Sequence, residues 1–138
     1  MNLPSTCLSI ILITSLSACS LISPLVINYN GVRRDVATYI NNNMRFSLSD
    51  RRVLVYYAKQ QQEILSKKIL TPEEQVHLAQ KLAEVEYCSS KKVSLKKLNL
   101  VNAQIFALDD QQAKLKYYQA LQAQQNIDVE NIDCSDKY

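Results

Sequence analysis

Glycine is almost missing from this chain, and proline is sparse. The 138 residues contain a single glycine, Gly31, and only three prolines. β-Sandwiches and β-barrels need many tight turns and normally use more glycine than this. Glutamine, lysine, leucine and alanine are abundant instead, and these residues favour helices. The composition therefore predicts an all-α protein.

The residue types that usually carry chemistry are also scarce. His77 is the only histidine, so a metal site of the usual composition is not visible. One glycine cannot build a phosphate-binding loop, and no serine has the glycine flanks of a nucleophile elbow. Asp109 and Asp110 are adjacent, so on a helix they point to different faces and do not pair. We expect no catalytic activity, no cofactor and no small-molecule substrate.

Charge is missing from the start of the chain. No charged side chain occurs from Met1 to Ala18, and the largely apolar run Leu8–Leu16 is too short to span a bilayer, which takes roughly 20 residues. The run ends in Leu16-Ser17-Ala18-Cys19. These four residues resemble, position for position, the lipobox of bacterial lipoproteins. The leader departs from ordinary signal peptides because residues 1–6 contain no lysine or arginine.

The lipoprotein resemblance divides the chain. It implies a cleaved signal peptide over residues 1–18, with a diacylglycerol on the Cys19 thiol and an acyl group on its new amine. Residues 19–30 would form the lipidated anchor and tether, and residues 31–138 the helical domain. The tether segment Leu25–Tyr29 is apolar, unlike a flexible linker. We expect it to dock on the domain or to lie at the membrane surface.

The same resemblance predicts the compartment. Ser20 beside the lipidated cysteine is similar to the outer-membrane sorting pattern of enteric bacteria. We therefore expect a protein of the cell envelope, anchored in the outer membrane and facing the periplasm. The net charge of +3 lies entirely after residue 18. This excess is too small to indicate nucleic-acid binding, and export would remove the opportunity.

The four cysteines can be assigned on this basis. Cys7 leaves with the signal peptide and Cys19 carries the lipid, which leaves Cys88 and Cys134. An oxidising periplasm favours a disulfide between them. The alternative is an intermolecular bridge to a partner.

Periodicity and capping residues predict about four helices. Thr71-Pro72-Glu73-Glu74 is the clearest signal, because threonine can cap a helix, proline suits its first position and Glu74 completes a capping box. The Val53–Tyr57 run has strand propensity, but it continues into a helix-favouring run without a turn residue. The expected helices are Val32–Arg45, Ser47 or Ser49 to Lys68, Thr71–Tyr87, and one from after Ser90 to Gln125, which Asp109-Asp110 could divide into two.

Each expected helix has an apolar face with a spacing of three or four residues. The residues predicted to face the core are Val32, Val36, Ile40 and Met44; Leu54, Tyr57, Ala58, Leu65 and Ile69; Val76, Ala79, Leu82, Ala83 and Tyr87; and Leu98, Val101, Ile105, Leu108, Leu115 and Leu121.

Four residues are candidate contacts with a protein partner. Lys92 and Lys96 share a helix face within a lysine cluster at residues 91–97, where positive charge opposes the helix dipole. The cluster would suit an acidic partner or an anionic envelope surface, and the favoured alternative is a solvated charged face without a partner. The doublets Tyr56-Tyr57 and Tyr117-Tyr118 can each direct one ring inward and the other outward, and exposed tyrosine favours protein recognition. We select Tyr56 and Tyr117 from the doublets.

The sequence favours a membrane-anchored, non-enzymatic protein-interaction module whose helix grooves bind a partner segment. The general design also resembles the secretin pilotins, which are small helical lipoproteins with one disulfide that escort an outer-membrane partner. That resemblance implies an escort role as the first alternative. A structural or surface-exclusion lipoprotein without a client is the second, and an enzyme or inhibitor whose site has no recognisable motif is the third.

Overall fold

The computed structural model describes residues 30–66, 68–128, 131–135 and 137–138. Within these ranges the chain forms five α-helices and one short 3₁₀ helix: α1 (Arg34–Asn42), α2 (Leu48–Gln61), η1 (Gln62–Leu65), α3 (Pro72–Ser90), α4 (Leu95–Ile105) and α5 (Asp109–Gln124). The expected all-α bundle is therefore confirmed, with one helix more than predicted. The predicted signal peptide, Cys19 and the predicted tether up to residue 29 lie outside the described residues.

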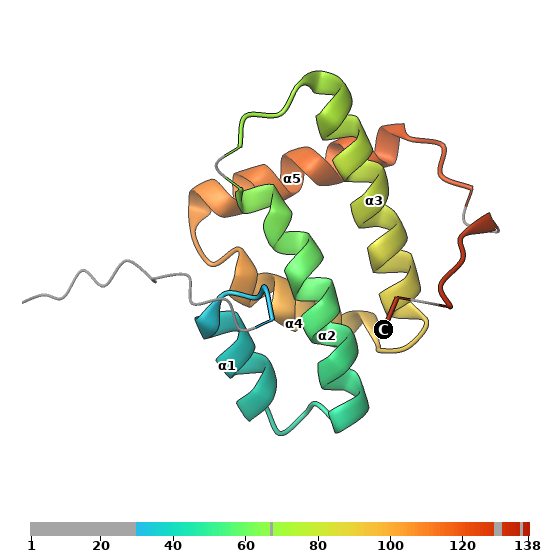
Figure 1. Cartoon of the computed structure of the whole chain (residues 1–138). Helices are drawn as coiled ribbons and strands as arrows, with labels where there is room; N and C mark the ends of the chain where they lie inside the picture. The colour runs from blue at the N-terminus through green and yellow to red at the C-terminus, as the bar shows by residue number, and fades with distance from the viewer. Residues whose placement is uncertain (1–29, 67, 129–130, 136) are drawn as a thin grey trace, which may run out of the picture.

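Helix α2 is the centre of the bundle. It packs against α1, α3 and α4, while α5 packs against α3 and η1. In Figure 1, α2 crosses the front of the molecule between α1 and α3, and α4 passes behind it. Leu54, Tyr57 and Ala58 of α2 are fully buried in the core between these helices. No helix among the described residues is long and apolar enough to cross a bilayer.

The caps that begin α2 and α3 are those that the sequence predicts. The Asp50 amide donates to Ser47 Oγ at 3.1 Å, and the Ser47 amide donates to Asp50 Oδ2 at 2.7 Å. The Glu74 amide donates to Thr71 Oγ1 at 3.3 Å, and the Thr71 amide donates to Glu74 Oε2 at 2.8 Å. Both are complete capping boxes, in which side chains satisfy amides that have no partner within the helix.

Three predicted helices end earlier than expected, and the first of them, α1, stops at Asn42 instead of Arg45. Helix α2 stops at Gln61, and a 3₁₀ turn that buries Ile64 replaces the predicted continuation to Lys68. The long helix after Ser90 is divided, as the Asp109-Asp110 alternative allowed. Phe106 ends α4 with a non-helical backbone (φ −107°, ψ 53°), and its side chain is 2% exposed. Core packing of this ring accompanies the change in chain direction.

Three apolar residues predicted to face the core are exposed instead. Met44 is 98% exposed, Ile69 is 93% exposed and Leu108 is 59% exposed. Each lies beyond the end of its helix, in the connections after α1, η1 and α4. The helical period that placed them on an inner face does not apply once the helix has ended. These three predictions were wrong.

The disulfide joins Cys88, near the end of α3, to Cys134 in the C-terminal tail, with the two Cα atoms 5.4 Å apart. The intrachain pairing is therefore confirmed. At the other end of the described chain, Asn30 and Gly31 form the predicted turn, with φ values of 56° and 83°. The disulfide thus attaches the C-terminal tail to α3.

Candidate functional site

A groove of about 420 Å³ runs along the outer face of α2. Three separate parts of the chain form its walls: the turn before α1, helices α1 and α2, and the C-terminal tail. The lining residues are Asn30, Asn41, Arg51, Arg52, Val55, Tyr56, Lys59, Lys137 and Tyr138. The groove therefore contains Tyr56, one of the predicted contacts, together with tail residues that the sequence did not indicate.

Two tyrosine rings form the aromatic part of this groove. The rings of Tyr56 and Tyr138 meet edge to face, with centroids 5.2 Å apart. The Tyr138 hydroxyl lies 3.1 Å from Oγ of Ser89, which is fully buried on α3. Burial raises the pKa of Tyr138 above its ordinary value. Because Cys134 is bonded to α3 four residues earlier, the tail is held where Tyr138 reaches Tyr56.

The groove is lined by cations, and no described lining residue is acidic. Arg51, Arg52 and Lys59 come from α2, and Lys137 comes from the tail, where it pairs with Glu84 at 3.5 Å. Three of these four cations have no ion pair with another described residue, so the described side chains that line the groove carry a net positive charge.

The acidic side chains of α1 and α2 are held elsewhere. Asp35 pairs with the Arg33 guanidinium at 2.7 Å, and Asp50 pairs with the Lys97 ammonium at 2.7 Å. The hydrogen bond from Lys97 lowers the pKa of Asp50, and the Ser47 amide lowers it further. These carboxylates therefore do not neutralise the groove.

The turn before α1 is fixed beside the groove. Gly31 has φ +83°, and a Cβ atom there would lie 2.9 Å from Cε of Lys59. The Arg33 amide donates to Gln62 Oε1 at 2.9 Å, and the Arg33 guanidinium donates to the carbonyl of Gln104 at 3.2 Å. The described chain therefore enters α1 from a defined position on the domain.

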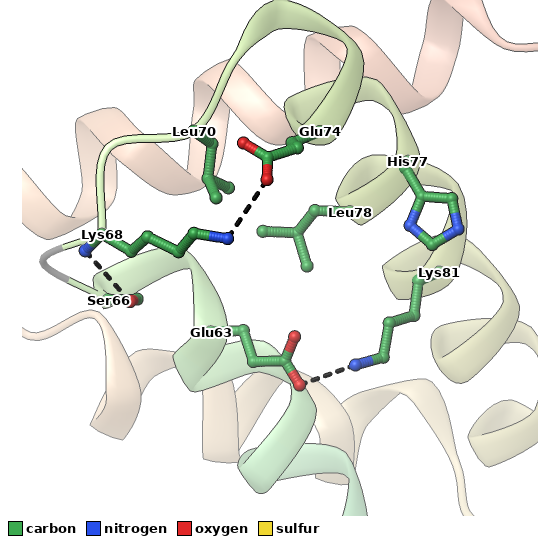
Figure 2. A pocket seen from close by; sticks show the side chains of 8 residues that line it. All are labelled: Glu63, Ser66, Lys68, Leu70, Glu74, His77, Leu78 and Lys81. Carbon is green, nitrogen blue, oxygen red and sulfur yellow. Dashed lines mark hydrogen bonds and ion pairs between the residues drawn. The ribbon is translucent and has the colours of Figure 1, made fainter.

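A second hollow, of about 380 Å³, lies between η1, the following loop and α3 (Figure 2). Ion pairs hold both of its carboxylates, with Glu63 2.7 Å from the Lys81 ammonium and Glu74 3.1 Å from that of Lys68. The Thr71 amide also lowers the pKa of Glu74, which serves as a cap. His77 lies at the rim, exposed to solvent. These acidic groups already have structural roles at the start of α3 and between α3 and η1.

No three His, Cys, Asp or Glu side chains in the described ranges are grouped as metal ligands would be. Tyr117 on α5 is 50% exposed, and its hydroxyl donates to Gln75 Oε1 on α3 at 2.6 Å. Lys92 and Lys96 are exposed, in the turn before α4 and in its first turn. Because neither lysine nor Tyr117 lines the groove that contains Tyr56, the four predicted contacts do not form one site.

No protein-family model, no curated protein and no solved structure matches this chain significantly. The chain's own features that bear on function are the lipobox-like residues Leu16-Ser17-Ala18-Cys19, the groove along α2 and the exposed ring of Tyr117.

Proposed function

We propose that this protein is a lipid-anchored component of the bacterial envelope that acts by binding another protein, without enzymatic activity. The Leu16-Ser17-Ala18-Cys19 lipobox supports the anchor. One acyl chain holds a protein only marginally, whereas two or more chains on Cys19 would attach it stably. We place the anchor in the outer membrane, facing the periplasm, because Ser20 follows Cys19.

The observation that carries the protein-binding role is the fixed, exposed ring of Tyr117. Its hydroxyl is held by Gln75, and its ring packs edge to face on Tyr118 with centroids 5.5 Å apart. A side chain already held in place loses little conformational entropy when a partner covers it. Tyrosine is also one of the residues that most often dominate the binding energy of interfaces.

Helix α5 can present this ring because little of the helix is buried. Tyr118 is the one buried residue among its sixteen, and Leu115 and Leu121 are partly buried against the core. The exposed Lys92 and Lys96 add positive charge that would favour acidic groups on a partner. This arrangement fits both an interaction module and the escort role of the pilotin-like alternative.

Site-specific photo-crosslinking in cells tests the protein-binding proposal. A photoreactive residue at Tyr117 should give a covalent adduct with a discrete envelope protein. The matched control is Gln119, which is exposed on a different face of the same helix. The captured protein should then bind the purified lipoprotein and lose roughly 2 kcal/mol of binding free energy on Tyr117→Ala substitution. Equal adducts from both positions, or none at native abundance, would contradict a binding role and favour the client-free structural alternative.

The mass of the mature protein tests the anchor. We expect a chain that begins at Cys19 and carries a thioether-linked diacylglycerol. A Cys19→Ala variant should lose this mass and remain unprocessed. An unmodified chain that begins at Met1 and is found in the cytoplasm would overturn the proposed anchor.

A further inference from the structure

The exposed face of α2 combines apolar and cationic side chains. Leu48, Arg52, Val55, Tyr56 and Lys59 have the spacing of one helix face, opposite the buried residues of this helix. Leu48, the first residue of the helix after the Ser47 cap, is 79% exposed. We call these five residues the α2 stripe.

The loop before α2 continues the same composition. Met44 is 98% exposed, and Arg45 beside it is exposed as well. Residues 30–61 contain six cationic side chains and two acidic ones, and both acids are held in the ion pairs with Arg33 and Lys97. The positive excess of the protein is therefore concentrated where exposed apolar side chains also gather.

The α2 stripe lies beside the place where the tether joins the domain. Asn30 lines the same groove as Arg52, Tyr56 and Lys59, and the Lys59 stem passes over Gly31. The chain between Cys19 and Asn30 spans at most about 40 Å when fully extended. Its last part is the apolar segment Leu25–Tyr29. If Cys19 is lipidated, these lengths and this segment keep the α2 stripe within reach of the bilayer.

We propose that the α2 stripe binds the headgroups of anionic phospholipids and so sets the orientation of the domain on the membrane. This inference rests on the lipid anchor of the proposed function. Tyrosine is enriched at the boundary between lipid and water, because its ring is apolar and its hydroxyl is polar. Exposed Leu48 and Met44 would enter the headgroup region, while Arg52 and Lys59 contact phosphates. Tyr117 lies on α5, which packs on α3 and η1, and so remains available to a protein partner.

A lipid surface is favoured over two other occupants of the groove. An acidic segment of another protein would match the charge, but it would leave Met44 and Leu48 exposed outside the groove. The chain's own Leu25–Tyr29 segment is apolar and would leave the cations unpaired. Anionic lipid accounts for both the charge and the exposed apolar side chains.

Fluorescence can test the inference cleanly, because the chain contains no tryptophan. Tyr56→Trp places a single reporter on the α2 stripe, and Tyr117→Trp places the matched reporter on α5. Each mature lipidated protein is inserted into vesicles of phosphatidylcholine alone or mixed with phosphatidylglycerol, with brominated acyl chains as quenchers. We expect a blue shift and strong quenching at position 56 in anionic vesicles only, and neither effect at position 117.

Charge variants provide the second measurement. Each cation that reaches an anionic surface strengthens binding about fivefold, so Arg52→Gln with Lys59→Gln should lower the ratio of docked to undocked protein about 25-fold. Lys92→Gln with Lys96→Gln is the matched control and should leave this ratio unchanged. Raising the salt concentration to 1 M, where the Debye length is about 3 Å, should reproduce the loss in the unsubstituted stripe.

The outcomes separate failure of the inference from failure of the anchor. Protein that does not float with any vesicle has no anchor, which overturns the proposed function and this inference together. Protein that floats while the position 56 reporter stays unquenched in anionic vesicles keeps its anchor but overturns the lipid contact. If the tryptophan at position 56 is already shielded from solvent in detergent, without vesicles, the chain's own Leu25–Tyr29 segment occupies the groove. If the tryptophan becomes shielded only when an acidic protein is added, the groove binds a protein. Either result would also overturn the inference.

Discussion

Adjacent tyrosines on α2 have opposite environments. Tyr57 is fully buried, and its hydroxyl accepts a hydrogen bond of 2.7 Å from Asn102 Nδ2 on α4, while Tyr56 lies in the outer groove. Burial raises the pKa of Tyr57 far above its ordinary value, because an unpaired phenolate would be costly in the core. Because neighbouring residues of a helix point in different directions, Tyr57 makes a hydrogen bond in the core while Tyr56 lies at the surface.

A Tyr57→Phe substitution should destabilise the protein by about 1–2 kcal/mol, because the buried amide of Asn102 loses its partner. Urea unfolding followed by circular dichroism would measure the loss. Tyr117→Phe is the control, and its exposed hydroxyl should contribute no more than about 0.5 kcal/mol. Equal effects of the two substitutions would show that the Tyr57–Asn102 hydrogen bond has no special weight.

Asp50 should make stability depend on pH. The Lys97 hydrogen bond holds its pKa below the ordinary value of 3.8 in the folded protein. The unfolded chain therefore takes up the proton first as the pH falls. The resulting stabilisation is present above pH 4 and is lost as the pH falls through the folded pKa.

Asp50→Asn should consequently destabilise the protein at pH 7 and have a smaller effect below pH 3. Urea unfolding at the two pH values would measure this difference. Asp110→Asn, at an exposed position of α5, is the control and should change the pH profile little. A loss of the same size at both pH values would assign the effect to packing instead of charge.

At the scale of elements, local signals account for where helices begin. The capping boxes at Ser47 and Thr71 require only residues within three positions of each other, so they can be recognised from sequence. Where helices end was less predictable. Phe106 ends α4 while its ring is buried in a core built from other helices, and that contact has no local signature.

Thr71→Ala should destabilise the protein by about 1 kcal/mol, because the Glu74 amide loses its side-chain acceptor. Thermal unfolding would detect it, with Thr71→Ser as the control that keeps the acceptor. Thr38→Ala, on the exposed side of α1, should have a smaller effect. If serine failed to restore stability at position 71, the capping hydrogen bond would not be the cause.

At the scale of the whole molecule, the disulfide fastens the tail to the bundle. Tyr118 is the last buried residue of the described hydrophobic core, and the tail after it contacts Cys88 and Ser89 of α3. The tail also contributes Lys137 and Tyr138 to the α2 groove. The Cys88–Cys134 bond therefore has a stabilising effect and also helps to build this surface.

Replacing both cysteines with serine should lower the free energy of unfolding by at most about 4 kcal/mol, the chain-entropy value for closing a loop of this size. The helical circular dichroism should persist, while limited proteolysis removes the tail. The oxidised protein under the same protease is the control. Loss of the helical signal at 25 °C would show that the bundle cannot fold without the bond.

The sequence by itself determined the helical class and the start of α3, because these follow from composition and from residues a few positions apart. It predicted the pairing of Cys88 with Cys134 through the lipoprotein resemblance and left an intermolecular bridge open, and the structure decided for the intrachain bond. Only the tertiary structure decided that α4 ends at Phe106, that Met44 is exposed, and that Asn30, Tyr56 and Tyr138 share one groove. These features depend on contacts between residues far apart in the chain, and the local sequence does not predict such contacts.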